Sequence, residues 1–146
     1  MTFTASFPAV LVSEGTGLGY LVRFPDFPEA LTSGADLQDA CIQGEDCLAE
    51  AIAGRIARGD AISTPSRLKR GQKLIGVPLY LAPKLALYLA MRDGGFRGTE
   101  VARRLGVSET VVRRMLNPKH VTKPEKIQAA LRVLGKQIVI SFEDAA

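Results

Sequence analysis

The chain has 146 residues, of which 47% are hydrophobic and 23% are charged, so it can bury a core and is not disordered by composition. Its length fits one ordinary domain or two small domains of about 70 residues each. No apolar run reaches the ~18 residues that a membrane helix needs. The N-terminal residues also lack the basic and apolar regions of a signal peptide, so we expect a cytoplasmic protein.

The net charge of +4 conceals an asymmetry between the two halves of the chain. Residues 1–64 contain three arginines and nine acidic residues, which gives a net charge of −6. Residues 65–146 contain 16 basic and six acidic residues, which gives a net charge of +10. The basic half has the balance expected of a nucleic-acid-binding protein, whereas the acidic half suits a basic protein partner.

Three strands are predicted in the N-terminal part. Residues 7–12 form an apolar run, a glycine-rich turn follows, and residues 20–24 alternate between apolar and polar side chains as in a hairpin. Pro25 and Pro28 cannot donate hydrogen bonds to a sheet, so the chain leaves the sheet there or runs along its edge. A short third strand is predicted over residues 29–33.

A long helix is predicted next, from an N-cap at Asp36 to a stop near Gly59. Its apolar stripe consists of Leu37, Ala40, Cys41, Gly44, Leu48, Ala51, Ile52 and Ile56. The other face carries Gln38, Asp39, Glu45, Asp46 and Glu50, and a solvated exterior is the simplest explanation for it. With a fourth strand over residues 73–77, residues 1–78 would form a β-β-β-α-β unit that buries the stripe against the sheet.

Few residues suit metal binding or catalysis. Cys41 and Cys47 are six residues apart, so on a helix their side chains diverge by about 120°. His120 is the only histidine, and no cysteine–histidine cluster can complete a zinc site. We therefore predict two buried, reduced thiols, an ordinary exposed histidine, no metal, no cofactor and no catalytic residue.

The pattern becomes helical after Pro78. Four helices are predicted, over residues 83–93, 99–105, 108–116 and 122–134. Thr122 and Glu125 have the spacing of a capping box at the start of the last helix.

Residues 98–115 carry the strongest functional signal. Gly106 suits a tight turn and Ala102 a close helix crossing, as in a helix-turn-helix. The inward positions are Val101, Leu105, Val107, Val112 and Met115. A Ser108 cap followed by short polar residues and arginines suits major-groove reading. The predicted DNA-binding residues are Thr99, Ser108, Glu109, Thr110, Arg113, Arg114 and Lys119.

Two features qualify this interpretation. A structural helix pair with a solvated basic face is the alternative to a DNA-binding motif. Such motifs also often begin with glutamine, where this chain has Gly98. The glycine removes a contact to the DNA backbone or bases that glutamine usually supplies.

The C-terminal segment 137–142 has a β-type pattern, with Ile138, Ile140 and Phe142 on one face. A lone strand has unpaired backbone N–H and C=O groups that can pair with a strand of another chain. We therefore predict that two copies pair antiparallel and dimerise through these three side chains. The alternative is that the segment folds back onto its own helices or onto the N-terminal sheet.

Residues 24–34, Phe-Pro-Asp-Phe-Pro-Glu-Ala-Leu-Thr-Ser-Gly, run directly into the helix that begins at Asp36. With a helix-turn-helix after Val77-Pro78, the chain resembles HicB-family antitoxins over nearly all of its length. The resemblance implies an α+β protein with a truncated ribonuclease-H-like, toxin-binding domain over 1–78. It implies a helix-turn-helix domain for DNA binding and dimerisation over 79–146.

The function that this resemblance implies is that of an antitoxin and not of an enzyme. It would neutralise a HicA-type toxin, a small basic ribonuclease that cleaves mRNA, and repress its own operon by sequence-specific DNA binding. A two-metal nuclease would need converging carboxylates, whereas Glu14, Asp26 and Glu29 lie in or beside turns. The main alternative is a stand-alone helix-turn-helix repressor whose N-terminal domain senses a ligand or only oligomerises.

Overall fold

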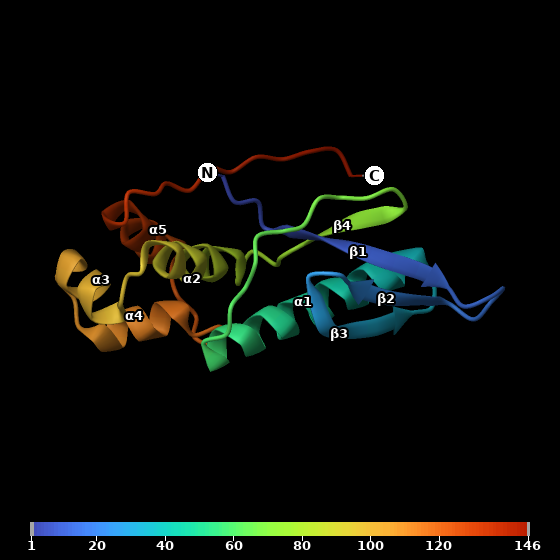
Figure 1. Ribbon diagram of the computed structural model, residues 1–146, viewed down its shortest axis with the longest axis horizontal. Helices are drawn as coiled ribbons and strands as arrows, with labels where there is room; N and C mark the ends of the chain where they lie inside the picture. Colours follow the sequence, from blue (N-terminus) through green and yellow to red (C-terminus); the bar gives the residue numbers. More distant parts are fainter. Residues whose placement is uncertain (1, 146) are drawn as a thin grey trace.

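The structure, a computed structural model, describes residues 2–145. Its elements in chain order are β1 (Ser6–Ser13), β2 (Tyr20–Phe24), β3 (Phe27–Gly34), α1 (Leu37–Arg58), β4 (Gln72–Gly76), α2 (Ala82–Gly94), α3 (Gly98–Leu105), α4 (Glu109–Leu116) and α5 (Pro124–Val133). The sheet and α1 lie at one end of the molecule, and α3, α4 and α5 lie at the other (Figure 1). The predicted α+β class and the β-β-β-α-β order of the N-terminal part are confirmed.

The four strands form one sheet in the order β3-β2-β1-β4, and every neighbouring pair is antiparallel. The two edge strands, β3 and β4, are therefore the ones that α1 connects along the chain. Pro28 lies in the edge strand β3, and Pro25 lies in the turn before it. Of the two alternatives that these prolines left open, the chain takes the edge position and does not leave the sheet, because an edge strand can leave N–H positions without partners.

Helix α1 begins and ends where the sequence predicts. The Asp36 carboxylate accepts a 2.8 Å hydrogen bond from the Asp39 backbone N–H, and the Asp39 carboxylate accepts one of 2.8 Å from the Ala35 N–H. This reciprocal pair satisfies N–H groups that the first turn leaves free. Gly59 ends the helix in the left-handed conformation, with φ of 72°. Of the predicted stripe, Ala40, Gly44, Leu48, Ile52 and Ile56 are buried, Cys41 and Ala51 are half-buried, and Leu37 in the first turn is exposed.

Helix α2 belongs to two hydrophobic cores. Leu85 and Tyr88 are buried with the sheet and α1. Leu87 and Met91 lie on another side of α2 and are buried with α3, α4 and α5. The helix therefore packs against both parts of the molecule, and its displacement would disturb both cores.

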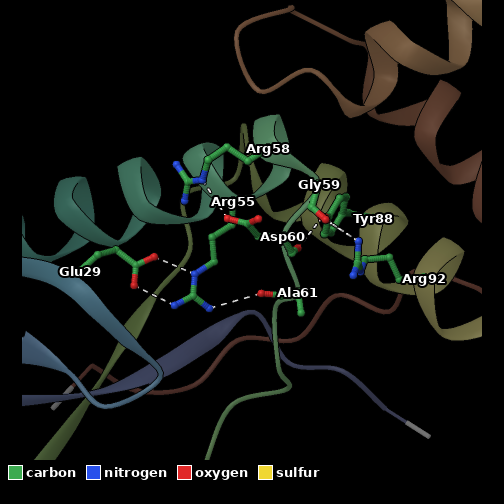
Figure 2. Close-up of polar contacts among 8 residues, drawn as sticks. All are labelled: Glu29, Arg55, Arg58, Gly59, Asp60, Ala61, Tyr88 and Arg92. Atoms are coloured by element: carbon green, nitrogen blue, oxygen red, sulfur yellow. Dashed lines mark hydrogen bonds and ion pairs between the residues drawn. The ribbon is translucent and has the colours of Figure 1, made fainter.

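Polar contacts also join α2 to the end of α1 (Figure 2). The Tyr88 hydroxyl donates to the Asp60 carbonyl oxygen, and Arg92 donates a 2.8 Å hydrogen bond to the Gly59 carbonyl oxygen. The Arg92 guanidinium carbon lies 5.4 Å from the centroid of the Tyr88 ring. These contacts place a cation and a hydroxyl donor on the two backbone carbonyls that directly follow α1, at the negative end of its dipole.

The predicted capping box at Thr122 does not form, and α5 begins at Pro124 with no side-chain capping bond. The Thr122 hydroxyl instead accepts a 2.8 Å hydrogen bond from Lys84, which lies 38 residues earlier in the chain. A tertiary partner has therefore replaced the local one that the spacing predicted.

Residues 137–142 form no strand within this chain. Ile138 is half-buried against the core of α2 to α5, whereas Ile140 is 91% and Phe142 98% exposed. A strand needs a hydrogen-bonded partner, and the described part of the chain supplies none to this segment. The predicted β pattern is thus present in the sequence without a β ladder in the single chain.

Candidate nucleic-acid interface

Helices α3 and α4 are joined by the three residues 106–108. Gly106 has φ of 71°, and its N–H and that of Val107 donate to carbonyls of the last turn of α3. This is the αL ending that favours glycine. Ala102 and Val112 are buried between the helices, as predicted. Val107 was predicted to point inward, but it is 39% exposed because it lies in the turn outside both helices.

One side of α4 is polar and exposed, and we call it the α4 face. It consists of Thr110, Arg113 and Arg114, and the exposed N-cap residue Ser108 lies at the N-terminal end of the helix beside it. The opposite side of the helix carries Val112 and Met115, which are buried. Ser108 is the N-cap residue by position, but its side chain makes no capping hydrogen bond. The structure therefore gathers three of the predicted DNA-binding residues on one accessible face, with Ser108 exposed at the helix N-terminus.

Glu109 holds one of the arginines of this face. The Arg113 guanidinium forms an ion pair with the Glu109 carboxylate one turn earlier. Their side chains are 70% and 40% exposed, so the pair is weak and the guanidinium remains accessible to solvent. The predicted role of Glu109 as a direct DNA contact has a second explanation, which is that it orients Arg113.

The other predicted residues lie beside the α4 face. Thr99 is exposed in the first turn of α3, and Lys119 is exposed in the loop after α4. A Cβ atom on Gly98 would lie 3.6 Å from a Glu109 carboxylate oxygen, so the start of α3 is next to α4. Arg104 is bound within the fold, since it contacts Glu100 at 3.2 Å and donates to the Val133 carbonyl at 3.2 Å.

A buried cation behind α4 was not found by the sequence analysis. Lys84, in the first turn of α2, is 2% exposed and donates to backbone carbonyls at the end of α4. Desolvation by burial lowers the pKa of this lysine from its ordinary value of 10.5. No feature of the sequence around Lys84 distinguishes it from an ordinary helical lysine.

The acidic residues of the N-terminal half lie mainly on the outside of α1. Glu45, Asp46 and Glu50 are exposed there, while Asp39 is half-buried because its carboxylate caps the helix. We call Glu45, Asp46 and Glu50 the acidic face. All three residues are exposed in the single chain, as either a solvated exterior or a partner-binding surface requires.

The cysteines are free thiols and half-buried, which is less buried than predicted. Desolvation raises the pKa of the Cys47 thiol. Within residues 2–145, no group of three or more His, Cys, Asp or Glu side chains is placed to hold a metal ion. No helix in the same range is both long enough and apolar enough to cross a membrane.

Comparison with known proteins gives this architecture a class. The family model of a HicB-like antitoxin of bacterial toxin–antitoxin systems matches residues 6–86, which run from β1 into α2. The chain is thus an antitoxin of the toxin–antitoxin type.

Curated relatives extend the match into the helical part. Antitoxin HicB of Escherichia coli (strain K12) is 34% identical over 132 residues, which cover 90% of this chain and 95% of that protein. Antitoxin HicB 1 of Photorhabdus laumondii is 33% identical over 132 residues, or 90% of this chain and 82% of that protein. Antitoxin HicB of Pseudomonas fluorescens is 28% identical over 121 residues, or 82% of this chain and 83% of that protein. The chain belongs to the HicB family of antitoxins.

Proposed function

We propose that the chain binds double-stranded DNA through α4 and thereby represses transcription of its own operon. The observation that carries this proposal is the polarity of α4, whose exposed side holds the Thr110 hydroxyl and two arginines, beside the exposed cap residue Ser108, while its other side is buried. In a helix-turn-helix the second helix enters the major groove with its exposed side. Serine and threonine bind base edges or phosphates, and arginine binds guanine or phosphate.

The second part of the proposal is that residues 1–78 bind and neutralise a HicA-type ribonuclease toxin, while residues 79–146 bind DNA. The family match covers the N-terminal part, from residue 6 to residue 86. A protein that binds RNA has a basic surface. The acidic face on α1 and the net charge of −6 over residues 1–64 are complementary to such a surface.

The third part is that the DNA-binding form is a homodimer. A helix-turn-helix that reads a palindrome needs two recognition helices set about 34 Å apart. Ile140 and Phe142 are almost fully exposed. Ile138, two residues before Ile140, packs against the core formed by α2, α3, α4 and α5. Antiparallel pairing of two such segments would bury these side chains and supply the hydrogen bonds that the single chain lacks.

Gel-shift titration of the full chain against the DNA immediately upstream of its own gene tests the first part. The variant Arg113→Ala/Arg114→Ala should lose specific binding, at ~1–3 kcal/mol for each base contact removed. Each phosphate contact removed should lower the salt slope by about one. Arg67→Ala/Arg70→Ala is the matched control, because it removes the same charge from an exposed loop before β4. Equal affinities of the two variants would refute DNA binding through α4.

Co-expression with the product of the adjacent gene tests the second part. The full chain should restore growth that this product inhibits and should co-purify with it. A chain that binds its upstream DNA but neutralises no neighbouring gene product would instead be a stand-alone repressor.

A further inference from the structure

Lys84 is the one buried charged side chain among residues 2–145. Its ammonium nitrogen donates to the carbonyl oxygens of Arg114 and Met115, each at 3.1 Å, and to the Thr122 hydroxyl at 2.8 Å. An ammonium group has three hydrogens, and each has an acceptor here. No ion pair among the described residues joins Lys84 to a carboxylate.

The acceptors belong to the last turn of α4 and to the loop that follows it. Helix α4 ends at Leu116, so the carbonyls of Arg114 and Met115 lack the partner four residues on that a continuing helix would supply, and the Arg114 carbonyl accepts a 3.2 Å backbone hydrogen bond from the cap residue Asn117. The C-terminal end of a helix is also its negative end, which favours a cation there. Lys84 therefore binds the backbone of Arg114, a residue whose side chain is exposed on the α4 face.

Thr122 extends the contact to the loop that carries Lys119. Its hydroxyl oxygen accepts from Lys84 and lies 3.0 Å from the Nδ1 atom of His120. The helix end and the loop are thus fixed to one point on α2. Because α2 also packs against the sheet, this point is held by both cores.

Burying a lysine is costly, and an apolar side chain of similar size usually stabilises a core at least as well. Hydrogen bonds are directional, so the contacts of Lys84 fix the orientation of the end of α4 relative to α2, which an apolar contact would not do. We propose that Lys84 is a positioning residue that sets the orientation of α4 for sequence-specific DNA recognition. This inference rests on the DNA-binding function proposed above.

Base contacts require a fixed helix direction, whereas phosphate contacts by long basic side chains tolerate small displacements. Loss of the Lys84 contacts should therefore reduce binding to a specific site more than binding to random DNA. A residue that only stabilised the fold would lower the amount of folded protein and leave the ratio of the two affinities unchanged.

The experiment uses the full chain and two duplexes, the DNA immediately upstream of its gene and a random sequence of equal length. Lys84→Met removes all three donors from a side chain of similar length. Thr122→Val removes one acceptor of Lys84 and also the donor of a 3.4 Å hydrogen bond to the Arg114 carbonyl, so it tests the Lys84–Thr122–Arg114 contact as a unit. Thr122→Ser is its matched control because it keeps the hydroxyl. Affinities are measured on protein shown to be folded by circular dichroism, at two salt concentrations.

We expect Lys84→Met to lower the ratio of specific to random affinity about tenfold or more, which corresponds to the loss of one base contact. Thr122→Val should lower the ratio less, and Thr122→Ser should retain it. If Lys84→Met does not fold, the comparison of Thr122→Val with Thr122→Ser decides. If the folded Lys84→Met or Thr122→Val variant has the wild-type ratio of specific to random affinity, the positioning role of Lys84 is overturned. The proposed DNA-binding function would be unaffected by that result. Failure of the wild-type chain to prefer its upstream DNA would overturn the proposed function itself.

Discussion

Arg55 donates two hydrogen bonds of 2.7 Å to the two carboxylate oxygens of Glu29 (Figure 2). The pair joins the last turns of α1 to the edge strand β3, across 26 positions of sequence. The Arg55 guanidinium carbon also lies 4.4 Å from the centroid of the buried Phe27 ring. A bidentate pair placed over an aromatic ring has a defined geometry, so it fixes the angle at which the end of α1 meets the sheet.

The pair should make stability depend on pH. The hydrogen bonds from Arg55 hold the pKa of Glu29 below its ordinary value of 4.5. The folded state therefore binds this proton less readily than the unfolded state does. The stabilisation that the Glu29–Arg55 pair gives the fold is fully present above a pH of about 4.5, and it is lost as the pH falls through the lower folded-state pKa of Glu29.

Glu29→Gln should thus destabilise the protein by about 0.5–1 kcal/mol at neutral pH, since the Glu29 side chain is 41% exposed and solvent weakens the pair. The difference from the wild type should shrink in acid. Urea unfolding of both proteins between pH 7 and pH 3 measures this. Glu45→Gln, at an exposed position of α1 with no ion pair among the described residues, should show no such trend. If the free energies of unfolding of Glu29→Gln and the wild type differ by the same amount at all pH values, the Glu29–Arg55 pair is not the source of the pH dependence.

The two glycines at the ends of α3 should respond oppositely to alanine. Gly98 begins the helix, and an added Cβ would make only ordinary contacts, the nearest at 3.6 Å. Gly98→Ala should stabilise the fold by about 0.4–1 kcal/mol by restricting the unfolded chain. Gly106 has a left-handed φ of 71°, so Gly106→Ala should cost about 1–2 kcal/mol. Thermal unfolding of the two variants measures the change in Tm. If both substitutions change Tm by the same amount in the same direction, the turn at Gly106 relaxes and the prediction is wrong.

The exposed C-terminal side chains should control assembly and leave the single chain intact. Ile140→Ser/Phe142→Ser changes two side chains that are 91% and 98% exposed. We expect the variant to unfold like the wild-type monomer but to dimerise and bind DNA more weakly, because pairing would otherwise bury both side chains. Light scattering and gel shifts measure the two effects. If both this variant and a chain truncated after Gly135 have the wild-type dimer mass and DNA affinity, the C-terminal segment has no role in dimerisation or DNA binding.

The acidic face should accelerate association with a basic toxin. The variant Glu45→Gln/Asp46→Asn/Glu50→Gln removes three negative charges from exposed positions. Its association rate with the toxin should fall at low salt and approach the wild-type rate at high salt, where charges are screened over a few ångströms. Glu14→Gln/Glu143→Gln/Asp144→Asn removes the same charge elsewhere and should have a smaller effect. Stopped-flow mixing provides the rates, and identical salt dependence of the two variants would exclude a specific role for this face.

Local pattern alone determined most of the elements of this protein. The Asp36 cap, the Gly59 stop and the apolar stripe between them define α1, because capping and helical periodicity depend on residues only a few positions apart. The polarity of α4 was predictable for the same reason. Pro28 excluded a central position for its segment and left either an edge strand or an exit from the sheet, since a missing donor is a property of the residue itself.

Only the tertiary structure decided the contacts that depend on distant partners. Lys84 reads as an ordinary helical lysine, yet its three acceptors lie 30 to 38 residues away. The same contact took Thr122 out of its predicted capping box, because a buried ammonium binds a hydroxyl more strongly than a solvated backbone N–H does. For residues 137–142 the periodicity predicted a strand, but pairing needs a second strand in reach, and sequence pattern carries no information about where that partner lies.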